Sequence, residues 1–156
     1  ISEEVEETYK SDPYKHLLVQ TLNDRLAEAA TEKMHEYVRK EAWGYAPNES
    51  LSIPDLLVEK YQGIRPAVGY PSLPDQSVNF LLDELLDMGQ TGITLTENGA
   101  MHPHSSVCGM MLAHPASRYF AVGKIGADQL EDYARRRGMP IENMRKFLAG
   151  NIESAS

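Results

Sequence analysis

The amino-acid sequence predicts an α+β fold in which an antiparallel twisted sheet is flanked by helices. Three helical segments lie between residues 12 and 88, three short extended segments follow between residues 93 and 125, and two helical segments close the chain. Because the strands are grouped rather than alternating with helices, an antiparallel meander is favoured over a parallel, doubly wound sheet. The 156 residues, 42% of them hydrophobic, suit one domain with its own core.

The longest helical segment is predicted over residues 12–43, with Asp12 as its N-cap, Pro13 at its first position and Gly44 as its stop. Apolar residues recur along it at three- and four-residue spacing and predict its core face: Leu18, Leu22, Leu26, Ala29, Ala30, Met34, Tyr37 and Val38. Residues 1–11 are acidic and polar, and we expect a frayed start or linker remnant there, followed by a domain over 12–152.

Two shorter helices are predicted next. Ser52 caps the first, over residues 54–61, and Asp55 holds the capping-box position. The second opens at residues 74–76 and reaches residue 88.

The predicted strands cover residues 93–96, 106–113 and 119–125. Asn98-Gly99 marks either the turn after the first strand or a bulge. The second strand is nearly all apolar or small, as in a strand that is buried on both faces or packed against a ligand. Helices over residues 128–138 and 140–148 complete the chain.

Composition excludes several classes of protein. A net charge of −8 argues against a nucleic-acid partner, and no run of about 18 apolar residues suggests a membrane span. The chain begins at Ile1 without a signal peptide, so we expect a piece of a longer, cytoplasmic polypeptide. The single Cys108 excludes an internal disulfide, and we interpret Arg135-Arg136-Arg137 as a solvated helix end.

A stiff loop, Gly63-Ile64-Arg65-Pro66-Ala67-Val68-Gly69-Tyr70-Pro71, separates the helical segments. The two prolines keep Arg65 and Tyr70 out of the helical region, and the glycines permit positive φ or close backbone approach. A loop this stiff holds its side chains in place, which favours a binding role.

Recognisable catalytic motifs are absent from the sequence. It has no phosphate-binding glycine loop, no Gly-x-Ser-x-Gly elbow and no cysteine-nucleophile motif. His102-x-His104 alone is a weak metal signal, and we expect no metal site; His16 and His35 are predicted to lie on the surface of the long helix. From these patterns a small-molecule site is favoured over an active centre.

The motif from Arg65 to Pro71 resembles the Arg-x-x-x-Gly-Tyr-Pro signature of the reactivation domain of cobalamin-dependent methionine synthase. Further blocks are similar to the same family, in family order over residues 14–151. They are Asp24-Arg25-Leu26-Ala27-Glu28-Ala29, Trp43-Gly44-Tyr45-Ala46-Pro47-Asn48-Glu49, Tyr61-Gln62-Gly63-Ile64, Leu95-Thr96-Glu97, His114-Pro115 through Tyr119, and Asp132-Tyr133-Ala134-Arg135-Arg136.

The resemblance implies a domain that binds S-adenosylmethionine and caps a cobalamin-binding domain, so that oxidised cob(II)alamin is reductively methylated with an electron from flavodoxin or a flavoprotein reductase. It implies cobalamin and zinc only on other domains, and no turnover by this chain alone. It also implies a longer domain, whose N-terminal half supplies an acidic ligand residue. For flavodoxin, which is acidic, Arg135-Arg136-Arg137 or Arg145 with Lys146 offers a basic patch.

The resemblance assigns the ligand residues one by one. Arg65 matches the arginine that pairs with the ligand carboxylate, and Tyr119 and Phe120 match a family pair that is usually Tyr-Tyr. The full set implied for S-adenosylmethionine is Arg65, Pro66, Ala67, Gly69, Tyr70, Tyr119, Phe120, Glu28 and Glu59, and His102 and Ser105 are implied to face cobalamin. The alternatives left open are a loop-anchoring ion pair for Arg65, a packing role for Tyr70, solvated Glu28 and Glu59, and a stand-alone binding or assembly module that has lost the ligand.

Overall fold

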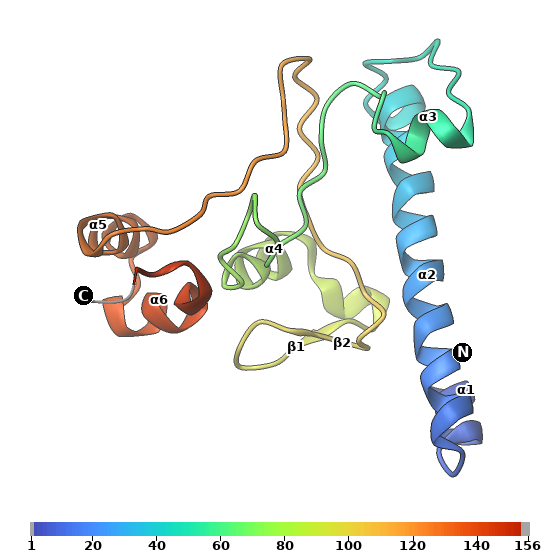
Figure 1. Cartoon of the computed structure of the whole chain (residues 1–156), viewed down its shortest axis with the longest axis horizontal. Helices are drawn as coiled ribbons and strands as arrows, with labels where there is room; N and C mark the ends of the chain where they lie inside the picture. The colour runs from blue at the N-terminus through green and yellow to red at the C-terminus, as the bar shows by residue number, and fades with distance from the viewer. Residues whose placement is uncertain (1, 154–156) are drawn as a thin grey trace. The chain divides into compact units, whose positions relative to one another are not determined.

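A computed structural model describes residues 2–153, which form two compact units (Figure 1). Unit 1 comprises Ile1–Arg65 and Met101–Arg118, and unit 2 comprises Pro66–Ala100 and Tyr119–Ser156. The elements in chain order are α1 (Ser2–Tyr9), α2 (Pro13–Tyr37), a π-helical turn (Val38–Ala42), α3 (Ile53–Leu57), α4 (Val78–Leu86), a 3₁₀ turn (Met88–Thr91), β1 (Thr94–Leu95), β2 (Met101–His102), α5 (Ala127–Arg137), α6 (Ile141–Phe147) and a 3₁₀ turn (Ala149–Asn151). The predicted α+β class is confirmed. No helix among the described residues is long and apolar enough to cross a membrane.

Helix α2 begins as the sequence predicts. The Asp12 side chain accepts a hydrogen bond from the Lys15 amide at 3.2 Å, and Pro13 occupies the first turn. The helix then continues as a π-helical turn, Val38–Ala42, before Gly44, whose φ is +71°. The preceding segment differs from the expected linker remnant, because Ser2–Tyr9 forms α1, which folds back along α2 (Figure 1).

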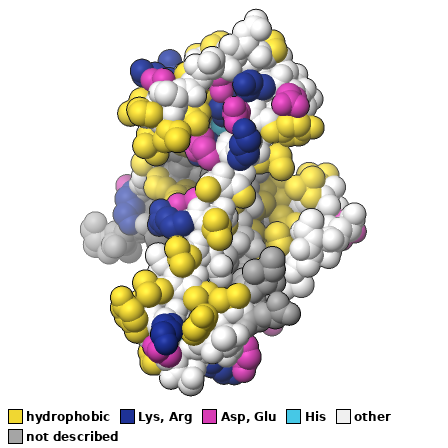
Figure 2. Space-filling view, turned by 90° about the vertical axis from the view of Figure 1, so that its right-hand side faces the viewer, with side chains coloured by type: hydrophobic (Ala, Val, Ile, Leu, Met, Phe, Trp, Pro, Cys, Tyr) yellow, Lys and Arg dark blue, Asp and Glu magenta, His cyan; other side chains and the backbone are white. Residues whose placement is uncertain are grey.

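The predicted core face of α2 is wrong. The side that packs within unit 1 is largely polar and runs at four-residue spacing through Asn23, Ala27, Thr31, His35 and Arg39; of these, His35 and Arg39 have no exposed surface. The predicted core residues form a second ridge that is open to solvent: Leu18, Leu22, Leu26, Ala29, Ala30, Met34 and Tyr37. Hydrophobic side chains lie in several patches among charged groups on the face shown in Figure 2.

The end of unit 1 is fixed by one short β-bridge. Ile64 exchanges backbone hydrogen bonds with Leu112, at 3.0 Å and 2.9 Å. Gly63 makes this approach possible, because a Cβ atom on it would lie 2.3 Å from the Leu112 carbonyl oxygen. The strand predicted over residues 106–113 is otherwise absent, since only Gly109 and Leu112 within this described segment take part in β-bridges.

The core of unit 2 lies between α5 and α6. Leu130, Ala134, Met144 and Leu148 are buried there, and Gly138 ends α5 with a positive φ, as predicted. The predicted turn at Asn98-Gly99 connects β1 to β2, which form a two-stranded sheet. The strand predicted over residues 119–125 is not formed; in its place an extended segment makes a single parallel bridge between Ile125 and Ile152.

A buried ion pair changes the interpretation of the arginine cluster. Arg137 turns inward and lies 3.3 Å from the Asp75 carboxylate, which also accepts a hydrogen bond from the Tyr133 hydroxyl at 2.8 Å. Burial and the Asp75 carboxylate raise the pKa of Tyr133 to about 12. Only Arg135 and Arg136 are solvated as predicted, and both pair with Asp132.

Candidate functional site

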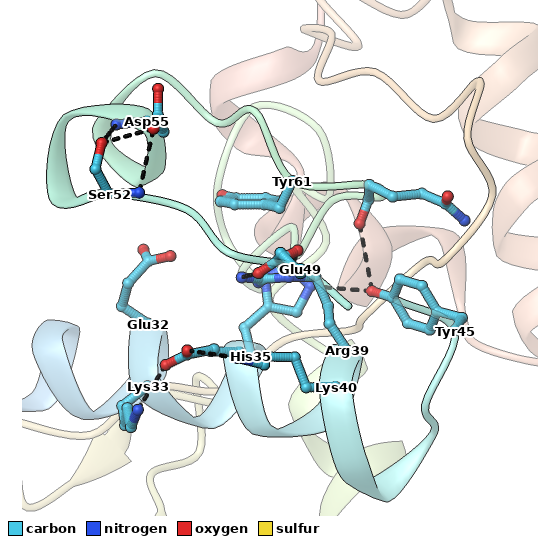
Figure 3. Close-up of polar contacts among 12 residues, drawn as sticks. Glu32, Lys33, His35, Arg39, Lys40, Tyr45, Glu49, Ser52, Asp55 and Tyr61 are labelled. Carbon is cyan, nitrogen blue, oxygen red and sulfur yellow. Dashed lines mark hydrogen bonds and ion pairs between the residues drawn. The ribbon is translucent and has the colours of Figure 1, made fainter. Parts of the chain in front are cut away.

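Arg65, the arginine of the motif, lies in a cluster with three residues on one face of α2 and the π-helical turn that continues it. Glu32, His35 and Arg39 are three and four positions apart, so their side chains leave the helix on the same side. Figure 3 shows them projecting toward Tyr61, which precedes the Arg65 loop. The cluster belongs wholly to unit 1.

Arg39 is the structural anchor of this cluster. Its Nε and Nη2 atoms donate to the two carboxylate oxygens of Glu49 at 2.8 Å and 2.6 Å, a fork-like pair that is closed to solvent. Its guanidinium also lies 4.3 Å from the centre of the Tyr61 ring. The remaining Nη1 atom has no hydrogen-bond partner among the described residues.

Acceptors on Glu32, Tyr61 and His35 hold the Arg65 guanidinium. Its Nη1 donates to Glu32 Oε1 at 3.0 Å and to the Tyr61 hydroxyl at 3.2 Å, and its Nη2 makes a short contact with Glu32 Oε2. Nη1 also lies 3.1 Å from His35 Nδ1. The Arg65 side chain keeps 21% of its surface exposed and the Glu32 side chain 30%, so solvent still reaches this pair.

The environment of His35 sets its protonation. Arg65 has only donors, so Nδ1 of His35 must accept and the ring proton belongs on Nε2, which lies 3.5 Å from the Tyr45 hydroxyl (Figure 3). Burial, together with the positive charges of Arg39 and Arg65, lowers the pKa of His35 to about 4. The imidazole is therefore neutral at pH 7, and the predicted surface position of His35 is wrong.

In unit 2 the Gly-Tyr-Pro part of the motif is tied to the predicted aromatic pair. Ser72 Oγ accepts a hydrogen bond from the Phe120 amide at 3.1 Å and makes a short contact with the Phe120 carbonyl, while the Val122 amide donates to the Pro71 carbonyl at 2.9 Å. The three aromatic side chains remain open: Tyr70 and Phe120 are each 64% exposed and Tyr119 is 39% exposed. Gly69 has a φ of +87°, which suits glycine at this turn.

The other predicted site residues have varied surroundings. Pro66 is buried and Ala67 half-buried. Glu28 pairs with Arg25 at 2.7 Å on the exposed side of α2, and Glu59 is exposed with a positive φ of 55°. Ser105 Oγ donates to Asp24 at 2.9 Å, and the rings of His102 and His104 meet edge to face. No group of three or more metal-ligating side chains occurs within the described part of the chain.

Sequence reasoning missed Glu32, Tyr61 and Ser72. The available signal for Glu32 was its place on the ridge that carries His35 and Arg39, a row of charged and titratable residues at helical spacing. No local pattern marks Ser72, whose partner Phe120 lies 48 positions away. Tyr61 contacts Arg65 four positions on, but its ring also packs on His35 and Arg39, which lie far along the chain.

The fold and this cluster together describe an α+β domain whose sequence carries no recognisable catalytic nucleophile. A family model described as "Vitamin B12 dependent methionine synthase, activation domain" matches residues 1–138, so the chain belongs to this family. It is also similar to the crystal structure of the MetH reactivation domain bound to AdoHcy, with 46% sequence identity and a TM-score of 0.94. The alignment covers 99% of this chain and 48% of that chain, so this chain spans about half the length of the solved domain.

Proposed function

We propose that this chain binds S-adenosylmethionine as part of a methionine synthase reactivation domain. The observation that carries the proposal is that a relative with 46% identity over 99% of this chain is a reactivation domain bound to AdoHcy, S-adenosylhomocysteine. AdoHcy differs from S-adenosylmethionine by the methyl group and the sulfonium charge, so the same residues serve both ligands. The biological role proposed is reductive methylation of cob(II)alamin, which restores methionine synthase to activity.

The chemistry of the present residues fits this ligand. A guanidinium recognises a carboxylate through paired, charge-assisted hydrogen bonds. Arg65 is therefore proposed to bind the carboxylate of the ligand's amino-acid tail. The exposed aromatic faces of Tyr70, Tyr119 and Phe120 suit an adenine or a sulfonium, and a cation near such a face is worth about 0.5–2 kcal/mol. Pro66, Ala67 and Gly69 are proposed to contact the ligand through their backbone atoms. Glu28 and Glu59 are candidate partners for the ligand's ammonium and sulfonium groups.

The partners are part of the same proposal. Cobalamin is brought by another domain of the synthase, toward which His102 and Ser105 are proposed to face. The hydrogen bond from Ser105 to Asp24 would orient that hydroxyl. Flavodoxin or a flavoprotein reductase supplies the electron, in the cytoplasm.

Calorimetric titration with AdoHcy tests the proposal on two proteins: this chain, and the same chain extended to the length of the solved relative. Wild-type protein is expected to bind in the extended form, and Arg65→Ala to weaken binding at least tenfold, because a hydrogen bond to a charged group contributes about 1.5–3 kcal/mol. Arg145→Ala, an arginine on α6 with a half-exposed side chain, is the matched control and keeps wild-type affinity. Absence of binding heat from both proteins would favour the module that has lost its ligand.

A further inference from the structure

The guanidinium of Arg65 is oriented before any ligand arrives. Glu32 spans both terminal nitrogens, and Tyr61 and His35 add contacts to Nη1 at 3.2 Å and 3.1 Å. A free arginine side chain has several rotatable bonds and loses much rotamer entropy when it is fixed. Contacts that fix it in advance spare a ligand that cost.

We propose that Glu32, with His35 beside it, is a positioning residue that fixes the plane of the Arg65 guanidinium for the carboxylate of an S-adenosyl ligand. This inference rests on the proposed function. Two features of the cluster support it: Glu32 engages the guanidinium through both oxygens, and the Arg65 side chain stays 21% exposed.

His35 contributes by being an acceptor. Protonation of Nδ1 would replace its hydrogen bond to Arg65 with repulsion between two cations. The groups that surround the ring make the neutral form the stable one: Arg65 and Arg39 are cations, Tyr45 is a hydroxyl at 3.5 Å, and Tyr61 meets the ring edge to face at 4.9 Å. Glu49, the nearby carboxylate, is already paired with Arg39.

A competing role for Glu32 makes the opposite prediction. If Glu32 merely occupied the place of the ligand carboxylate, the ligand would have to displace it, and removing its charge would strengthen binding. The positioning role instead requires that Glu32→Gln weaken binding.

The test compares two ligands by calorimetry on the extended protein: AdoHcy, which carries the amino-acid tail, and 5′-methylthioadenosine, which lacks it. Glu32→Gln is expected to weaken AdoHcy binding about tenfold and to leave 5′-methylthioadenosine binding within twofold. In an Arg65→Ala background the same substitution is expected to change AdoHcy affinity by less than twofold. Glu36→Gln, which removes a charge one turn further along α2, is the matched control and retains wild-type affinity.

Two results with Glu32→Gln would overturn the inference. Unchanged or tighter AdoHcy binding by Glu32→Gln excludes positioning, and an equal loss for both ligands indicates a purely structural role. If circular dichroism shows that Glu32→Gln does not fold, Glu32→Asp replaces it, because aspartate keeps the charge on a shorter side chain. An AdoHcy affinity for Glu32→Asp between those of wild type and Arg65→Ala supports positioning. A wild-type affinity refutes it. If wild-type protein binds neither ligand, the proposed function fails and the inference with it.

Discussion

Replacing His35 with asparagine is expected to remove a pH-dependent part of the stability of unit 1. The folded pKa of His35 is about 4, below the unfolded value of 6.5. Between these values the unfolded chain binds more protons, so the free energy of unfolding is fully retained above pH 6.5 and falls as the pH drops toward 4. At roughly 1.4 kcal/mol per pH unit the whole loss is about 3 kcal/mol, and about 2 kcal/mol of it is reached by pH 5.

Urea unfolding followed by fluorescence measures this loss. The single tryptophan, Trp43, lies in unit 1 and packs edge to face on Tyr45, so its emission reports on the same unit as His35. Asparagine keeps an acceptor near the Nδ1 position and cannot titrate. Wild type and His35→Asn share the same carboxylates, so the difference between their unfolding free energies isolates the histidine.

That difference is expected to shrink by about 2 kcal/mol between pH 8 and pH 5, because only the wild type loses the stabilisation of a neutral imidazole. A difference that is constant over this range would refute the reasoning. It would mean that His35 titrates alike in the folded and unfolded chains.

Two further pairs of substitutions test the packing of unit 1 in the same urea assay. Gly63→Ala is expected to cost at least about 2 kcal/mol, because its φ is +91° and the new Cβ would collide with the Leu112 carbonyl; Gly44→Ala, with a φ of +71° but ordinary contacts, is expected to cost only the 1–2 kcal/mol of the backbone strain. Equal costs would argue against the close approach at Gly63. Leu26→Gln, at a side chain 68% exposed, is expected to change stability by less than about 0.5 kcal/mol, whereas Ile64→Ala, at 7% exposure, costs about 2–5 kcal/mol. A loss above 1 kcal/mol for Leu26→Gln would contradict the solvent exposure of that ridge.

The features that sequence predicts well here are those decided within a few residues. The Asp12 cap, the Ser52–Asp55 capping box, the Asn98-Gly99 turn and the Gly138 stop all form as expected. Each depends on hydrogen bonds or φ values that neighbouring residues control. Distant partners have no influence on them, which is why a local pattern suffices.

The features that sequence predicts badly depend on partners elsewhere. Helical periodicity correctly finds an apolar ridge on α2, but it cannot tell which ridge faces the rest of the unit; here the ridge of His35 and Arg39 does. An apolar extended segment becomes a strand only when another strand supplies its hydrogen bonds, and residues 106–113 form only isolated bridges within the described chain, at Gly109 and Leu112. The motif identified Arg65 as important, but Glu32 is 33 positions away.

The charge balance around Tyr61 bears on the ligand proposed for Arg65. Arg39 and Arg65 pair with Glu49 and Glu32, and His35 is neutral, so these five described side chains together carry no net charge. A ligand with a lone carboxylate would add an uncompensated negative charge to a partly buried site, which is unfavourable. An amino-acid tail brings an ammonium together with its carboxylate and leaves the balance unchanged. The neutral cluster therefore favours a zwitterionic tail, such as that of an S-adenosyl ligand, over a simple carboxylic acid.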